Sequence, residues 1–493
     1  MKSIKDCTLL VLLLMAGGVT MQAQNSKSNR ELPEQYWVDL VTEQPEGYVV
    51  DANGNVHIYS AEALTWISVV SNGFNGQEID NFEGRTVSLE VNVNMAAAIW
   101  TPISERIDMP PFKGSFDGKE HIIDGLQLTG PNPYADAGFF GNLFEASLSN
   151  IVIRNGYFEG EGGYDTGFLA AQVVKSRIDH CFVNCEIHGG RSVPFVFSNN
   201  GSIITNCLAY CPLLQNGNQD ICGAFVAESR LYNGDGTLPT IRNCAAIIEK
   251  MDWPWGESCG FVGWFNHGLI ENCYVYIHEI LNFPGYGGGS GLGPRNGITR
   301  DNMGEVYNCY YNRIRNFDPA FSGYYMQLDD SPGEGGNFYD TSPFIEEGRG
   351  HWKLTEEITF EHENGTVSTN DLLDALNFKV QLLDDEVLLE WCDTGMGFDN
   401  RQLPVFCDFD VTQTSDNATS LDQVEVYPNP ARETVTIEGI EAAEVQVYNA
   451  LGQLVKSVRW ANEVDFGELV EGVYLVRITD KEGNAYSERI VKE

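Results

Sequence analysis

Pairs of cysteines four residues apart are the first candidates for chemistry in this chain. Cys181 and Cys185 have the spacing that zinc ligands use, and so do Cys207 and Cys211. A zinc site needs four ligands that converge on one point. Residues four apart in a β-rich repeat leave the backbone in different directions, so we predict no metal site at these cysteines.

Two further stretches resemble ligand-binding loops. DANGNVHIYSAE (residues 51–62) has the carboxylates and amides of a calcium loop, but Val56 occupies the sixth place, where the sharp turn needs glycine. Asn53-Gly54 between β-formers predicts a hairpin instead. The glycine-rich stretch 285–297 lacks the Gly-Lys-Ser/Thr ending and the following helix of a phosphate loop. We therefore predict no cofactor.

Candidate catalytic residues are few. NHGLI, which contains His267, resembles the His-Gly of polygalacturonases. Glycoside hydrolysis also needs two carboxylates across the scissile bond, and the nearest pair, Asp329-Asp330, has no Arg-x-Lys companion. We interpret His267 as a turn residue and predict no catalytic residue.

Aromatic residues gather in the longer segments of the chain and give the strongest hint of a ligand. Flat aromatic faces can stack on sugar rings. Partly buried packing under long loops is the alternative interpretation. The predicted ligand-binding residues are Trp253, Trp255, Trp264, Phe265 and Tyr286.

These candidates lie within a repeat. The phrases SRIDHCFVNC, SIITNCLAYC, PTIRNCAAII, GLIENCYVYIHE and GEVYNCYYNR align one column of residues, spaced 25 to 37 apart: Leu126, Ile151, Cys181, Cys207, Cys244, Cys273 and Cys309. A second column precedes it: Phe139, Phe168, Phe195, Phe225 and Phe261. Short apolar strands that recur at this interval predict a solenoid. We predict an all-β fold, a right-handed parallel β-helix.

This fold gives the repeated residues a physical role. Coils stack about 4.8 Å apart, so equivalent inward positions form a ladder. Cysteine would fill a narrow interior slot, and its partners one coil away are close enough for disulfides, although free buried thiols are the preferred interpretation. The asparagine before each cysteine would accept a left-handed turn, and glycine before phenylalanine would serve a tight corner.

Both ends of the repeat carry candidate caps. Residues 60–73 predict a helix with Ser60 as its N-cap, which would close the open end of the solenoid. Residues 368–380 predict a second short helix. After it, Trp391 and Phe406 could cover the other end.

The segments IWTPI, FKGSFDGKEHIIDGLQL and AGFFGNLFEASLSNIVI (residues 99–103, 112–128 and 137–153) resemble the GLUG-motif β-helix proteins of Bacteroidetes. The likeness covers roughly residues 47–410. The later coils depart from the pattern, because cysteine replaces an aliphatic residue there and inserts lengthen the loops.

The last segment differs in pattern. Apolar and polar residues alternate across turns at Asn429-Pro430 and Leu451-Gly452, which predicts a small antiparallel Ig-like β-sandwich. Residues 424–493 resemble the C-terminal sorting domain of type IX secretion cargo. The resemblance implies recognition by the type IX secretion machinery, removal of the tail, and release or attachment at the cell surface. An ordinary Ig-like binding module is the alternative.

The start of the chain predicts export. Residues 1–23 carry two lysines, a short apolar run and Met-Gln-Ala, as in a signal peptide. Residues 24–46 would form a lead-in, 47–410 the β-helix with its caps, 411–423 a linker and 424–493 the sorting domain. The apolar run is too short for a membrane helix, and no other stretch approaches the length of one. Without Cys7, eleven cysteines remain, so at least one is unpaired or pairs between molecules.

The formal net charge of -40 opposes nucleic acid or anionic membrane as a partner. We therefore expect an exported protein at the outer-membrane surface or outside the cell. The preferred hypothesis is a non-enzymatic, adhesin-like protein that binds a glycan or host matrix component. The alternatives are a polysaccharide lyase or glycoside hydrolase, recognised by carboxylates or by a carboxylate with Arg or Lys on an exposed sheet face, and a purely structural surface component.

Overall fold

The computed structural model divides the chain into two compact units, residues 1–409 and 410–493. It describes residues 30, 32–106, 108–130, 137–160, 165–215, 223–252, 260–281, 298–312, 333–340, 352–362, 365–383, 385, 387–392, 403–407, 425–438, 442–449, 454–459, 462–467, 469–470, 472–480 and 485–492. The predicted signal peptide and the linker 411–423 lie outside these residues.

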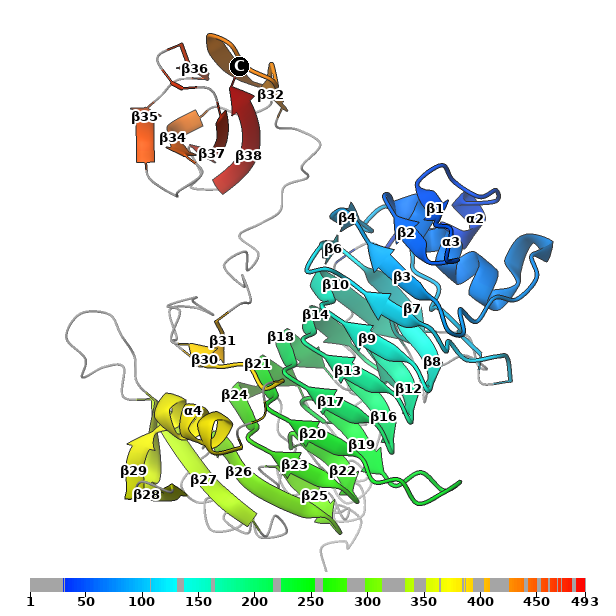
Figure 1. Cartoon of the computed structure of the whole chain (residues 1–493), viewed down its shortest axis with the longest axis vertical. Coiled ribbons are helices and arrows are strands. Elements are labelled where there is room, and N and C mark those ends of the chain that lie inside the picture. Colours follow the sequence, from blue (N-terminus) through cyan, green and yellow to red (C-terminus); the bar gives the residue numbers. More distant parts are fainter. Residues whose placement is uncertain are drawn as a thin grey trace, which may run out of the picture. The chain divides into compact units, whose positions relative to one another are not determined.

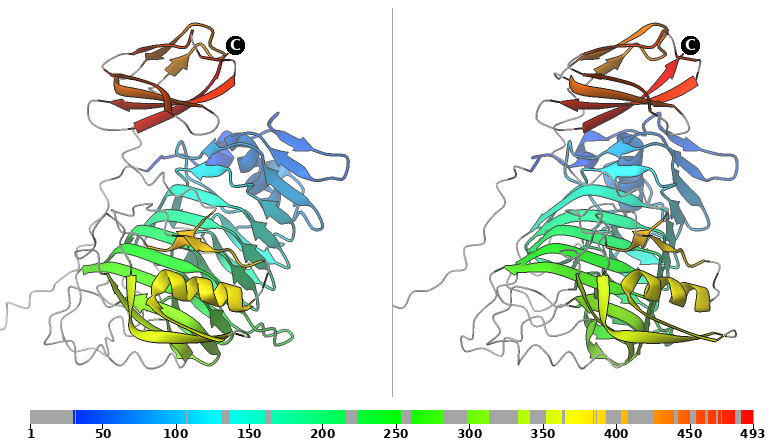
Figure 2. Two further views of the ribbon diagram at one scale, coloured as in Figure 1. Left: turned by 60° about the vertical axis from the view of Figure 1, so that its left-hand side comes forward. Right: turned by 90° about the vertical axis from the view of Figure 1, so that its left-hand side faces the viewer.

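The first unit is a parallel β-solenoid whose coils contribute strands to three ladders (Figure 1, Figure 2). The first sheet contains β2 (Val56–Ile58), β3 (Thr86–Leu89), β5 (Ser115–Asp117), β9 (Ser147–Ser149), β13 (Arg177–Asp179), β17 (Ile203–Thr205), β20 (Thr240–Arg242), β23 (Leu269–Glu271) and β26 (Glu305–Asn312). The second contains β4 (Val93–Asn94), β6 (Ile122–Asp124), β7 (Gln127–Gly130), β10 (Val152–Gly160), β14 (Phe182–His188), β18 (Leu208–Gln215), β21 (Ala245–Asp252), β24 (Tyr274–Leu281), β26 again and β27 (Gly333–Asp340). The third contains β8 (Phe140–Phe144), β12 (Ala170–Val174), β16 (Val196–Asn200), β19 (Val226–Arg230), β22 (Val262–Asn266) and β25 (Thr299–Asn302). The prediction of a parallel β-solenoid is confirmed.

The two columns found in the sequence lie inside the solenoid. All five phenylalanines of the second column are fully buried. The rings of Phe195 and Phe225 stack with centroids 4.4 Å apart, and those of Phe225 and Phe261 with centroids 4.7 Å apart. The cysteines of the first column are at most 3% exposed and are free thiols, as preferred above.

Left-handed turns explain why asparagine precedes cysteine. Asn150, Asn206, Asn243, Asn272 and Asn308 have φ between 51° and 55°, and His180, the one exception in sequence, has φ 52°. After such a turn each thiol donates to the carbonyl two residues earlier, for example Cys207 Sγ to Thr205 O at 2.9 Å and Cys244 Sγ to Arg242 O at 3.0 Å. A thiol can satisfy this inward carbonyl and an aliphatic side chain cannot.

Glycine before phenylalanine has another cause than the tight corner that we predicted. Gly138 and Gly167 do not have positive φ. A Cβ at Gly138 would lie 2.4 Å from the Gly167 carbonyl oxygen, and one at Gly167 would lie 2.1 Å from that of Ala170. Close approach of neighbouring backbone therefore excludes a side chain here.

The N-terminal elements agree with the sequence. Strand β1 (Tyr48–Val50) pairs antiparallel with β2, which confirms the hairpin at Asn53-Gly54. Helix α2 (Trp37–Leu40) and the 3-10 turn η1 (Phe74–Gly76) flank helix α3 (Ala61–Asn72), whose predicted N-cap, Ser60, accepts from Ala63 N at 3.1 Å. Helix α3 lies at the beginning of the solenoid (Figure 1), so it closes that end.

On the C-terminal side, the second predicted helix is present with shifted bounds, whereas the predicted cap is wrong. Helix α4 spans Leu372–Leu383, because residues 368–371 belong to β29 (Gly365–Asp371), and Asp371 caps the helix by accepting from Leu373 N at 3.0 Å. Trp391 and Phe406 do not cover the end of the solenoid. After the last parallel strand, β27, the sheet continues antiparallel through β28 (Trp352–His362) and β29.

The second unit consists of two small antiparallel sheets that share one apolar core. One sheet holds β32 (Glu425–Tyr427), β33 (Thr434–Glu438) and β36 (Glu463–Asp465). The other holds β34 (Ala442–Asn449), β35 (Leu454–Arg459), β37 (Gly472–Asp480) and β38 (Ala485–Lys492). The predicted antiparallel β domain is confirmed at this level.

Candidate functional site

The chain leaves the second sheet and enters the third at one edge of the solenoid. Strand β21 ends at Asp252 and β22 begins at Val262, while β24 ends at Leu281 and β25 begins at Thr299. Three of the five predicted ligand-binding residues fall in these two connections, and the other two fall in β22. Trp253, Trp255 and Tyr286 belong to the two connections and lie outside the described residues, and the backbone of Trp264 lies in β22, although its side chain is not among the described ones.

Phe265 of β22 is the predicted ligand-binding residue whose side chain is described. It is partly exposed on the third sheet. The guanidinium carbon of Arg230 lies 4.8 Å from the centroid of its ring, a cation–π contact. The ring of His267 lies 6.0 Å away and is nearly parallel to it. Phe265 therefore belongs to a short row of planar groups.

Polar side chains extend this row across two neighbouring coils. Arg230 Nη2 lies 2.6 Å from Glu228 Oε2, both on β19. Ser198 of β16 donates to Glu228 Oε1 at 3.1 Å and accepts from Asn200 Nδ2 at 3.0 Å. The third sheet thus carries hydrogen-bonding groups beside an aromatic ring, which is the combination that sugar sites use.

A second charged pair lies on two short parallel strands, β11 (Asp165–Gly167) and β15 (Arg191–Val193). In the sequence these strands directly precede β12 and β16 of the third sheet. Arg191 Nη1 lies 3.1 Å from Asp165 Oδ1. Burial raises the pKa of the Asp165 carboxyl, Arg191 opposes that rise, and the charge of Glu228 adds to it. The Glu228 charge therefore acts on the Asp165–Arg191 pair.

The sequence reasoning missed Asp165, Arg191, Glu228 and Arg230. Inserts of different length precede these residues, so no fixed spacing links them. The register of the strands shows which residues are neighbours: Asp165 pairs with Arg191, Ser198 with Glu228, and Asn200 with Arg230.

His267 lies in the turn between β22 and β23. Its backbone N donates to Ser229 O at 2.9 Å, and its Nδ1 accepts from Leu231 N at 3.3 Å. These contacts fit the interpretation of a turn histidine. The carboxylate pair Asp329-Asp330 and the glycine-rich stretch 285–297 lie outside the described residues.

The metal candidates take structural roles. Asp51 accepts from the backbone N of Asn53 and Asn55, at 2.8 and 2.9 Å, and so closes the hairpin. Cys181 and Cys185 both lie in the core, where Cys185 approaches Pro194 O at 3.9 Å. Across the described part of the chain, no group of three or more His, Cys, Asp or Glu residues could hold a metal ion.

Comparison with known proteins identifies the second unit. Residues 425–493 match the family described as secretion system C-terminal sorting domain. The chain therefore carries a type IX sorting domain, which indicates export to the cell surface or the extracellular space. In the described part of the chain, no helix is long and apolar enough to cross a membrane.

Similarity to a curated protein covers a small part of the chain. An endo-acting ulvan lyase of Formosa agariphila is 26% identical over 104 residues, which is 20% of this chain and 20% of the lyase. The chain thus spans about a fifth of the length of this relative. No solved structure matches.

Proposed function

We propose that this chain is an exported β-solenoid protein that binds a polysaccharide on the third sheet without cleaving it. The observation that supports the proposal is the partly exposed Phe265 ring beside Arg230, with the partly exposed Glu228 and Asn200 as polar neighbours on the same sheet. Trp253, Trp255, Trp264 and Tyr286 would extend this surface from the β22 strand and the adjoining connections.

The ligand that fits best is a glycan of low negative charge, from another cell or from a host matrix. The net charge of -40 repels a polyanion. Among the described residues of this side, Arg191 and Arg230 already pair with Asp165 and Glu228. Binding would then depend on ring stacking and hydrogen bonds, and it would change little with salt.

Export completes the proposed function. Residues 1–23 would direct the chain through the inner membrane, and residues 424–493 would be recognised by the type IX machinery and removed. The likeness of residues 47–410 to GLUG-motif proteins fits a surface-attached or released product. A purely structural surface component remains the expectation if no glycan binds.

A glycan array followed by calorimetry tests the proposal. Phe265→Ala in the mature protein should weaken binding about five- to tenfold, the loss of one aromatic contact. The matched control is Phe144→Ala, which removes a partly exposed ring from β8 in the same sheet. The proposal fails if Phe265→Ala binds as tightly as the unsubstituted protein to every glycan that is retained.

A lyase is the second candidate, because Asp165, Arg191, Glu228 and Arg230 provide carboxylates and guanidinium groups on one side of the solenoid and the relative is an ulvan lyase. An arginine could neutralise a uronate carboxylate while a base removes the neighbouring proton. Incubation with ulvan and other uronate polysaccharides would produce unsaturated, ultraviolet-absorbing ends. Such a product, absent in Arg191→Ala, would replace the binding proposal.

A further inference from the structure

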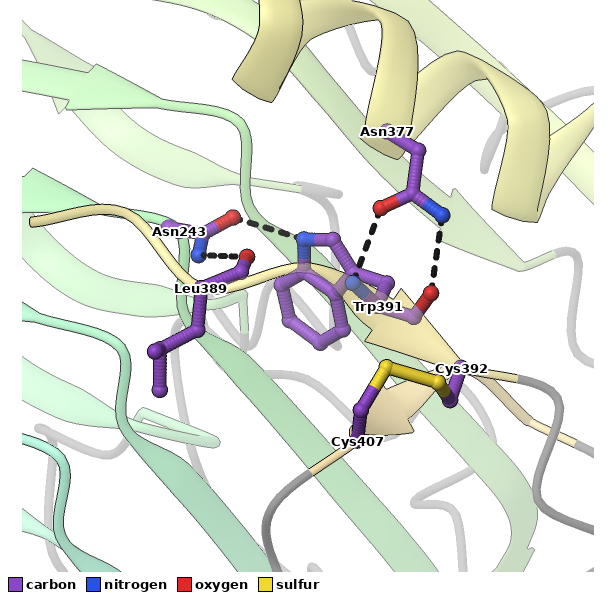
Figure 3. Close-up of a disulfide and its surroundings, with 6 residues drawn as sticks. All are labelled: Asn243, Asn377, Leu389, Trp391, Cys392 and Cys407. Carbon is purple, nitrogen blue, oxygen red and sulfur yellow. Dashed lines mark hydrogen bonds between the residues drawn. A yellow bond between two sulfur atoms is a disulfide. The ribbon is translucent and has the colours of Figure 1, made fainter. Parts of the chain in front are cut away.

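A strap made of two short segments, residues 387–392 and 403–407, lies along the side of the solenoid (Figure 3). Strand β30 (Trp391–Cys392) pairs antiparallel with β31 (Val405–Phe406). A disulfide between Cys392 and Cys407 joins the two segments. The disulfide therefore cross-links the strap to itself and not to the solenoid.

The strap docks on the asparagines of the left-handed turns. Asn206 Nδ2 donates to Val387 O at 2.8 Å, and Asn243 Nδ2 donates to Leu389 O at 2.9 Å. Leu389 N donates back to Asn206 Oδ1 at 3.0 Å, and Trp391 Nε1 donates to Asn243 Oδ1 at 2.6 Å. The asparagine side chains of the solenoid thus bind mainly the backbone of the strap.

The same asparagines also bind one another. Asn243 Nδ2 donates to Asn206 Oδ1, and Asn272 Nδ2 donates to Asn243 Oδ1, each at 2.8 Å. Asn308 Nδ2 continues the series with a 2.7 Å bond to Asn272 Oδ1. We call this series the asparagine ladder. Its bonds join side chains of the solenoid alone.

Aromatic packing completes the docking. The indole of Trp391 is the part of the strap that packs on the second sheet. Its ring centroid lies 4.2 Å from that of Phe406, also in the strap, and 5.5 Å from that of Tyr274 in β24. The Tyr274 hydroxyl donates to Pro404 O. Asn377 of α4 clamps the Trp391 backbone by accepting from its N and donating to its O, both at 2.8 Å. The strap therefore covers part of the outer face of the second sheet.

The disulfide is open to solvent, whereas the core thiols are not. Cys407 is exposed and Cys392 is half-buried. The seven free cysteines of the described residues are all buried, and burial raises the pKa of the Cys181, Cys207, Cys244 and Cys309 thiols well above the ordinary value. A mild reductant or oxidant therefore reaches the strap cysteines without reaching the core column.

We propose that the Cys392–Cys407 disulfide is an oxidation-operated latch: it holds the strap on the asparagine ladder, and its reduction releases the strap while the solenoid stays wound. To close the latch, the thiolate of one cysteine attacks the disulfide of a thiol oxidoreductase and forms a mixed disulfide. The second thiolate displaces the oxidoreductase, which leaves as a dithiol with the two electrons and two protons. This latch does not depend on the proposed glycan site.

Hydrogen exchange of the full-length mature protein, with and without dithiothreitol, tests the latch. Dithiothreitol becomes a cyclic disulfide while Cys392 and Cys407 become thiols. Because the cross-link closes a loop of 15 residues, its loss should weaken strap docking about a hundredfold. The Leu389 and Trp391 amides should exchange faster by a similar factor, and those of β18, β21 and β24 should not change. Iodoacetamide should then label Cys392 and Cys407 and leave Cys207, Cys244 and Cys273 unlabelled.

The double variant Cys392→Ser/Cys407→Ser is the matched control. It should show fast strap exchange without reductant and no further change when dithiothreitol is added. Two results would overturn the proposal. Strap amides that stay protected after reduction would make the disulfide dispensable, and equal loss of protection in β18, β21 and β24 would make it a general staple of the fold.

Discussion

At the scale of single residues, the asparagine of each coil combines two roles that the sequence shows as one letter. Asn243 accepts a φ of 51°, which most side chains avoid, and its amide joins the asparagine ladder. Its Oδ1 also accepts from the indole of Trp391. Backbone conformation and hydrogen bonding therefore both select asparagine here.

Two substitutions at this residue should separate the roles. Asn243→Gly keeps the left-handed turn and removes the amide, which should cost about 1–3 kcal/mol because Leu389 O and the neighbouring amides lose partners. Asn243→Ala also strains the turn, by about 1 kcal/mol more. Chemical denaturation measures both. Equal stability of the two variants would show that the turn does not select the residue.

The residue scale also shows where sequence reasoning stops. Asparagine, cysteine and phenylalanine recur in fixed phrases, so their ladders were predictable. Glu228 pairs with Arg230 of its own strand and accepts from Ser198 of the neighbouring coil. Inserts of unequal length separate the coils in sequence, so the sequence alone does not show which residues of two coils are neighbours. Trp391 was predicted to cap the solenoid, but its indole donates to Asn243 on the side of the solenoid instead, because the chain turns back after α4.

At the scale of elements, the phenylalanine stack carries much of the cohesion between coils. Phe195, Phe225 and Phe261 are fully buried and stack in sequence through three coils. In a solenoid each coil contacts only its neighbours, so a defect in one coil weakens two interfaces.

Phe225→Ala should therefore lower the free energy of unfolding by about 3–5 kcal/mol, as for other buried phenylalanines. Phe144→Ala, which removes a partly exposed ring from the end of β8, should cost less than half of that. Urea denaturation followed by far-ultraviolet circular dichroism compares the two. Similar costs for both variants would contradict the view that the inner stack dominates.

At the scale of the whole molecule, the two compact units have separate cores and separate roles. The sorting tail was predictable from its phrases because they match a family along almost their whole length. The ligand of the solenoid was not, since coils of this kind define a scaffold, and loops and surface side chains define what it binds.

Removal of residues 410–493 should leave the thermal midpoint of the solenoid within about 2 °C of the value in the full chain, because the deletion removes no part of its core. The truncated protein should accumulate in the periplasm and should not reach the cell surface. Calorimetry and cell fractionation measure the two effects. A drop of many degrees would mean that the units stabilise each other.

The column of reduced cysteines has a consequence for how this protein must mature. Thiols that reach a compartment rich in oxidants can cross-link in the wrong order while they remain accessible. Cys181, Cys207, Cys244 and Cys273 avoid this fate only once neighbouring coils enclose them. Folding of the solenoid therefore competes with oxidation of its cysteines. A variant that folds slowly would give wrongly cross-linked protein rather than a smaller amount of correct product.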